Sequence, residues 1–95
     1  MTIDEFRATL QNGAPPDLSV PLQALWHDAR GDWNRAHEIA QDIDDDMGAW
    51  IHAYLHRKEG DAGNAAYWYR RARQPIANDP LEEEWTRIAT ALLTH

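Results

Sequence analysis

The sequence predicts an all-α protein of about six helices, and three observations carry that prediction. Apolar residues recur at every third or fourth position over most of the 95 residues. No long stretch alternates apolar and polar residues as a half-buried strand would. Residue types that begin helices precede the apolar runs, and glycines follow several of them. The chain length and the 43% hydrophobic content fit a single domain, residues 1–95, with one modest core.

The first helix is expected over residues 3–12. Thr2 and Glu5 stand three residues apart and form a capping box, in which each side chain accepts a hydrogen bond from the backbone N–H of the other residue. Gly13 lies where a helix of this length would stop. The APPD segment that follows has two prolines, which keep the backbone extended, so a linker is expected there.

Two helix pairs are expected next, at about residues 20–43 and 48–73. Ser19 precedes the first pair as a helix cap, and one aspartate of the DIDDD run is expected to cap the second pair. Each pair contains a Gly-Asp corner: a glycine can take the left-handed conformation that ends one helix, and the aspartate caps the next. The corners are Gly31 with Asp32 and Gly60 with Asp61.

A last helix is expected over residues 80–94, as a cap on the preceding helices. Asp79 is predicted to be its N-cap and Pro80 its first residue, and Glu82 to Glu84 suit the positive end of the helix dipole. The chain is rich in tryptophan, and every tryptophan falls on a predicted buried stripe. These residues are Trp26, Trp33, Trp50, Trp68 and Trp85.

The two helix pairs also echo each other in sequence. When Gly31 is aligned with Gly60, His27 falls on His56 and small alanines share two further positions. This pattern resembles the tetratricopeptide-type repeat, which the second unit matches better than the first. The matching residues there are Ala53, Gly60, Asp61, Ala65, Tyr69 and Ala72. The offset of 29 residues is shorter than the family's 34, and only two units are present.

The resemblance implies that the first helix of each pair lines an inner surface that binds a protein or peptide. Carried over to this chain, the partner-binding residues are Leu25, Asp28, Trp50, Tyr54 and Arg57. The lysines and asparagines that clamp a carboxylate in some members of the family are missing, so no particular ligand is implied. The chain also resembles a group of small bacterial proteins with LWHDA, GDW and AYLHRKEGD segments, which implies a bacterial cytoplasmic protein.

Charge and composition exclude several classes of function. The net charge is −7, and it comes entirely from residues 1–48, which hold ten acidic and three basic side chains. Nucleic acid is therefore not an expected partner, and the short cluster at Arg70, Arg71 and Arg73 is expected to be a solvated helix face. No apolar run is long enough for a membrane span, and without cysteine no thiolate metal site can form. No cofactor and no catalytic residue is predicted.

The histidines leave three interpretations open. His52 and His56 stand four residues apart with Glu59 nearby, a spacing that can direct two imidazoles and a carboxylate toward one ligand or metal ion. His27 occupies the equivalent place in the first unit. A second interpretation is that these histidines pack between helices and form hydrogen bonds there. A third is a contact that changes when an imidazole takes up a proton.

Two functions follow from these observations. The first is a noncatalytic module that binds another protein, or a second copy of itself as a homodimer. The alternative is a small ligand-binding or metal-binding protein, or an enzyme, that uses His27, His52 and His56.

Overall fold

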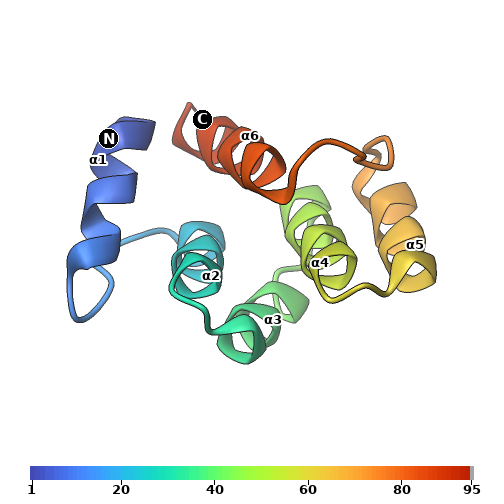
Figure 1. The fold of residues 1–95 in the computed structure, drawn as a ribbon, viewed down its shortest axis with the longest axis horizontal. Coiled ribbons are helices and arrows are strands. Elements are labelled where there is room, and N and C mark those ends of the chain that lie inside the picture. The colour runs from blue at the N-terminus through green and yellow to red at the C-terminus, as the bar shows by residue number, and fades with distance from the viewer. Residues whose placement is uncertain (95) are drawn as a thin grey trace.

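The computed structural model describes residues 1–94 and shows an all-α fold (Figure 1). In chain order its elements are α1 (Ile3–Ala8), the 3₁₀ helix η1 (Thr9–Gln11), α2 (Val20–Ala29), α3 (Trp33–Gln41), α4 (Asp46–Lys58), α5 (Ala62–Ala72) and α6 (Leu81–Leu93). The described residues form six α-helices and no strand, which confirms the predicted fold class. The predicted domain extends to His95, which lies outside the described residues. None of the helices within residues 1–94 has the length and apolar character needed to cross a bilayer.

The capping box of α1 forms as predicted. The Glu5 backbone N–H donates to Thr2 Oγ1 at 3.1 Å, and the Thr2 N–H donates to Glu5 Oε1 at 2.8 Å. The helix is shorter than expected, because α-helical geometry ends at Ala8 and the chain tightens into the 3₁₀ turn of η1. Gly13 therefore lies beyond the helix end.

The two Gly-Asp corners take the predicted conformation. Gly31 and Gly60 have φ angles of +85° and +90°, in the left-handed region where a side chain is disfavoured. Asp32 accepts a hydrogen bond from the Arg35 backbone N–H at 3.1 Å, and Asp61 caps α5 in the same way. Each corner thus ends one helix and starts the next, and α2 packs beside α3 as α4 packs beside α5 (Figure 1).

The turn between α3 and α4 brings the backbone very close to the first turn of α4. Asp45 caps α4 by accepting a hydrogen bond from the Gly48 N–H at 3.0 Å, so the predicted aspartate cap is confirmed. Gly48 is buried directly against Ile43, where a Cβ atom on residue 48 would lie 2.6 Å from the Ile43 Cβ. Only a residue without a side chain fits at this contact.

Helix α6 folds back over α2 and α4 and reaches α1, so the first and last helices meet (Figure 1). The Trp85 indole N–H donates to the Leu25 carbonyl at 3.1 Å, and the Trp85 ring stacks on Phe6 with centroids 5.6 Å apart. Pro80 is the N-cap and Leu81 the first helical residue, so the prediction that Asp79 caps this helix is wrong. Asp79 is engaged elsewhere, since its carboxylate pairs with Arg87 and its carbonyl accepts from Arg57.

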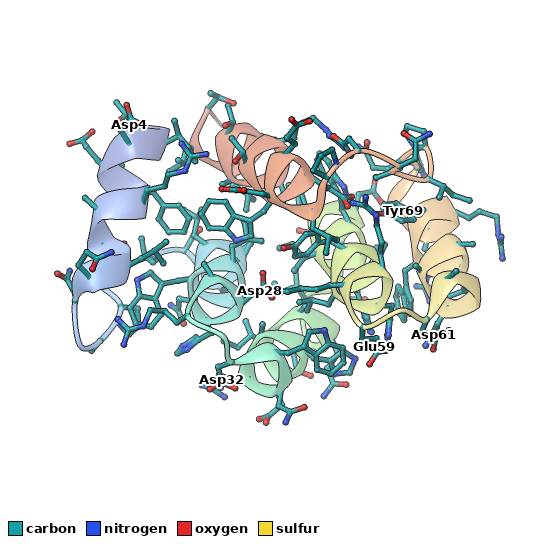
Figure 2. The ribbon with its side chains drawn as sticks, in the orientation of Figure 1. Asp4, Asp28, Asp32, Glu59, Asp61 and Tyr69 are labelled. Atoms are coloured by element: carbon teal, nitrogen blue, oxygen red, sulfur yellow. The ribbon has the colours of Figure 1, made fainter. Side chains whose placement is uncertain are left out.

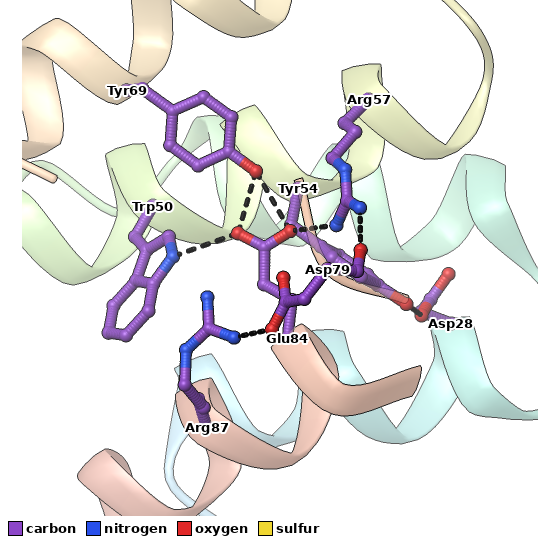
Figure 3. A network of polar contacts seen from close by, with 8 residues as sticks. All are labelled: Asp28, Trp50, Tyr54, Arg57, Tyr69, Asp79, Glu84 and Arg87. Atoms are coloured by element: carbon purple, nitrogen blue, oxygen red, sulfur yellow. Dashed lines mark hydrogen bonds and ion pairs between the residues drawn. The ribbon is translucent and has the colours of Figure 1, made fainter. Parts of the chain in front are cut away.

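A buried carboxylate fastens α6 to α4 and α5. Glu84 is fully buried, and Figure 3 shows donors from three sides converging on it. Trp50 Nε1 lies 3.2 Å from Oε2, the Tyr69 hydroxyl lies 2.6 Å from the same oxygen, and Arg57 Nη1 lies 2.7 Å from Oε1. Burial raises the pKa of Tyr69, and the neighbouring Glu84 raises it further, so the phenol keeps the proton that it donates.

The tryptophans divide into two groups. Trp26, Trp50 and Trp85 are buried in the core as predicted, whereas Trp33 and Trp68 are only half-buried. The half-buried pair comes from α3 and α5, which lie on either side of α4. These two indoles border the histidines described below.

Candidate functional site

The predicted partner-binding surface is covered by α6. Leu25 is fully buried, and Trp50 is 8% exposed, so both belong to the core and neither lines an open surface. The Arg57 side chain is 19% exposed, and its guanidinium forms an ion pair with Glu84. Two residues of the predicted set, Asp28 and Tyr54, border a space that α6 leaves open.

That space is a pocket of about 520 Å³ bordered by α1, η1, α2, α4 and α6, and it is called the inner pocket below. Its volume lies within the usual range of ligand-binding pockets, roughly 300–1,000 Å³. Its apolar lining comes from Leu10, Leu81 and Trp85. Its polar lining includes Asp28, Tyr54, Lys58, Arg7 and Glu82.

The polar centre of the inner pocket is a buried carboxylate. Asp28 is 2% exposed and points into the interior beside α4 (Figure 2). The Tyr54 hydroxyl donates to its Oδ2 at 3.0 Å, and Lys58 Nζ lies 2.9 Å from its Oδ1. Burial and the adjacent Asp28 both raise the pKa of Tyr54, so the hydroxyl stays protonated. Lys58, one turn after Tyr54, was not predicted, although its spacing of four residues places both side chains on one helix face.

The structure brings together two of the histidines selected from the sequence, with a different third histidine beside them. His52 and His56 of α4 are buried, and they meet His37 of α3, which is not among the predicted site residues. One ring nitrogen from each of the three lies within 4.8 Å of the others. His27 is not part of this group, because its ring lies edge-on against Trp26, with centroids 5.1 Å apart.

The three rings of this cluster, called the histidine cluster below, are held between two indoles. His37 Nε2 lies 3.0 Å from His52 Nε2, and the His52 and His56 rings stack with centroids 4.8 Å apart. Trp33 stacks on His37 at 4.9 Å between centroids, and Trp68 stacks on His52 at 3.9 Å. Ring orientation in the cluster is therefore fixed from both sides.

Glu59 determines which nitrogen of His56 carries a proton. Its Oε1 lies 2.6 Å from His56 Nδ1, and a carboxylate can only accept, so the N–H is on Nδ1. In the neutral ring, this tautomer leaves a lone pair on His56 Nε2. The amide of Asn64, in the first turn of α5, lies 3.4 Å from that nitrogen.

Two of the imidazoles are kept neutral by their surroundings. Burial lowers the pKa of His52 to about 4, and the nearby His37 and His56 add to the effect. Burial also lowers the pKa of His37, and a charge on His56 would lower it further. At neutral pH His37 and His52 thus present uncharged rings, in which one nitrogen donates and the other accepts.

Acidification is expected to destabilise the metal-free protein through His52. In the unfolded chain this imidazole titrates near its ordinary pKa of 6.5, whereas in the folded chain it stays neutral down to about pH 4. Between these values the unfolded state binds more protons than the folded state, so the free energy of unfolding falls as the pH is lowered. The contribution of neutral His52 to this free energy is complete above pH 6.5 and is lost as the pH falls toward 4. Urea unfolding midpoints measured with EDTA over this range would check it. The His52→Gln variant should show a shallower fall than the wild type, and parallel curves would contradict the assignment.

The chain therefore has two candidate sites of different chemistry. The inner pocket combines apolar walls with a neutralised Asp28–Lys58 pair, whereas the histidine cluster gathers three imidazoles between α3 and α4. The two sites share only α4, where Tyr54 and Lys58 face one site and His52 and His56 face the other. Comparison with known proteins finds no matching family, no similar curated protein and no similar solved structure.

Proposed function

We propose that this protein is a noncatalytic protein-binding module whose inner pocket receives an apolar side chain of a partner segment. The observation that supports this function is the pocket itself, which lies between the first helices of the two predicted pairs. Leu10, Leu81 and Trp85 provide apolar contact area for one inserted side chain. Burying such a side chain contributes roughly 1.5–3 kcal/mol to association.

The polar part of the pocket suits the backbone of a bound segment. Lys58 has three N–H donors, and Asp28 takes one of them. The remaining donors are available to a carbonyl oxygen of the partner, since the Lys58 side chain is 36% exposed. Because Asp28 neutralises the charge of Lys58, this contact adds no strong preference for an acidic partner.

The overall charge of the protein favours a basic partner, although the charges of Arg7, Lys58, Asp28 and Glu82 in the pocket lining cancel. The first turns of α1 and α6, two of the helices that border the pocket, carry exposed acidic residues. These residues are Asp4, Glu5, Glu82 and Glu83. The net charge of −7 extends the attraction beyond the pocket, and complementary charge speeds association.

The same charge argues against a second copy as the partner. Two copies would each bring a net charge of −7, so they would repel each other. The large apolar side chains that are exposed come from four separate segments: Met1, Val20, Tyr67 and Ile76. We therefore expect size-exclusion chromatography with light scattering to give a monomer of 10.9 kDa. A stable dimer would instead support the self-associating form of the function.

Filling the inner pocket is expected to weaken binding there. The probe is a pool of short peptides in which lysines flank one leucine or phenylalanine, and the matched pool carries glutamates instead of lysines. The basic pool should shift the indole N–H resonance of Trp85 in ¹H–¹⁵N spectra, and the acidic pool should not. Ala29 is exposed and lines the pocket, so Ala29→Trp should weaken binding by about tenfold or more, as the loss of at least 1.4 kcal/mol would.

The control for that variant is Ala62→Trp, which places the same indole at an exposed position at the start of α5. This variant should bind the basic pool as the wild type does. Equal binding of both pools, or an Ala29→Trp variant that binds normally, would overturn the proposed site.

A further inference from the structure

We infer that His37, His52 and His56 bind one divalent transition-metal ion, and that the ion is zinc or one with the same preference for imidazole. This site is independent of the proposed partner binding, because apart from α4 it uses different helices. It differs from the site expected from the sequence in its third ligand, which is His37 of α3 instead of His27 of α2.

The spacing of the three rings carries the inference. In a tetrahedral zinc site with Zn–N distances of 2.0–2.1 Å, the ligand nitrogens lie about 3.4 Å apart. His37 Nε2 and His52 Nε2 are 3.0 Å apart, and all three nitrogens are within 4.8 Å of one another. Side-chain rotations that move the nitrogens by about 1 Å would therefore bring them to coordination distances. The proton that His37 Nε2 and His52 Nε2 share must at the same time move to Nδ1 of the ring that carries it, so that both Nε2 lone pairs face the ion.

Glu59 gives His56 the arrangement that metal-binding histidines usually have. A ligating imidazole commonly donates its other ring N–H to a carboxylate, which fixes the tautomer and makes the ligating nitrogen more basic. Glu59 accepts from His56 Nδ1 at 2.6 Å and leaves the Nε2 lone pair free for a metal.

The surroundings hold the rings in place without competing for the ion. Trp33 and Trp68 stack on His37 and His52, and the Trp33 indole is itself fixed by a 2.8 Å hydrogen bond to the Leu55 carbonyl. The Arg71 guanidinium lies over the Trp68 ring, 5.1 Å from its centroid. Such packing lowers the entropy that a flexible set of ligands would lose on binding.

The ligand chemistry selects the class of ion. Three imidazoles and no thiolate suit zinc, copper and nickel, whereas calcium and magnesium prefer sets of oxygen ligands. Three protein ligands leave a fourth position for water or for a further side chain. Asn64 is placed to reach it, because its amide lies 3.4 Å from His56 Nε2 and rotation of that amide would present its oxygen.

Calorimetric titration of the untagged, EDTA-treated protein with zinc chloride tests the inference. We expect one equivalent to bind, the midpoint of thermal unfolding to rise, and cobalt(II) to give the visible absorption of a tetrahedral site. His37→Gln should weaken zinc binding by about 100-fold or more, and Glu59→Gln by roughly 10–100-fold, as for other outer-shell partners. Glu59 is 37% exposed, so its replacement tests the site without disturbing the core.

The matched control is His27→Gln, which removes a histidine that lies outside the cluster. This variant should bind zinc as the wild type does, and circular dichroism would establish that each variant is folded without metal. Absence of a one-to-one isotherm would overturn the inference. Equal weakening by His27→Gln and His37→Gln would overturn it as well, since it would show that binding does not depend on the cluster.

Discussion

Replacing Glu84 by alanine is expected to lower the free energy of unfolding by about 3–5 kcal/mol, because it breaks a buried ion pair and leaves its partners behind. This fully buried carboxylate accepts hydrogen bonds from Arg57, Tyr69 and Trp50. With alanine at position 84, each of these donors would lose its acceptor. For a domain of this size each kcal/mol moves the midpoint of thermal unfolding by roughly 4–8 °C. Urea and thermal denaturation followed by circular dichroism would measure the loss.

Two further variants distinguish the effect of the buried network on stability from the effect of changing α6 itself. Glu83 is exposed on the same turn of α6, so Glu83→Ala should change the free energy of unfolding by less than about 0.5 kcal/mol. Glu84→Gln retains the shape of the side chain but removes its charge, and we expect a loss between those of the two alanine variants. A loss below about 1 kcal/mol for Glu84→Ala would show that the network does not hold α6 in place.

Replacing Gly48 by alanine is expected to destabilise the protein by about 1–3 kcal/mol, the usual effect of forcing extra volume into a packed core. A glycine-to-alanine substitution within a helix normally has the opposite effect and stabilises the protein by about 1 kcal/mol. The reason is the contact with Ile43, whose Cβ and Cγ2 would lie 2.6 and 2.7 Å from the new methyl group. Unfolding in urea would give the difference directly.

Gly63 provides the matched comparison for this variant. It also lies in the first turn of a helix, α5, but a Cβ atom added there would meet nothing within 4 Å. Gly63→Ala should therefore stabilise the protein by about 0.5–1 kcal/mol. If the two substitutions changed stability in the same direction, the close approach at Gly48 would not be the cause.

Local features of this fold could be predicted from sequence because their physics is local. Gly31 and Gly60 end helices through their own backbone conformations, and Asp32, Asp45 and Asp61 cap helices through backbone N–H groups only three residues away. Such contacts depend on spacing along the chain and on little else. The all-α class and most of the helix bounds follow from them.

Features that depend on how helices meet could not be predicted in the same way. Asp79 fails as a cap because it interacts with Arg57 and Arg87, contacts that spacing near the helix start does not indicate. Glu84 was expected to interact with the positive end of the helix dipole, yet three donors distant in sequence surround its carboxylate. Spacing within α4 correctly grouped His52 with His56.

The third member of the histidine cluster shows the same limit. Whether His27 or His37 joins the cluster depends on which helix packs against the face of α4 that carries His52 and His56. Helix α3, which carries His37, packs there. A signal for His37 was present, since it follows Trp33 by four residues and therefore shares a helix face with it. The apolar spacing of that face predicts packing and gives no sign of which neighbouring helix the histidine meets.

The closing contact between α1 and α6 has a consequence for the order of folding. Arg7 donates to Thr86 Oγ1 at 2.6 Å across a separation of 79 residues, whereas the α2–α3 and α4–α5 pairs join helices that are neighbours in the chain. Loop-closure entropy makes distant contacts slower to form than local ones. The helix pairs are therefore expected to form early, and the joining of the two chain ends is the late event that completes the native state.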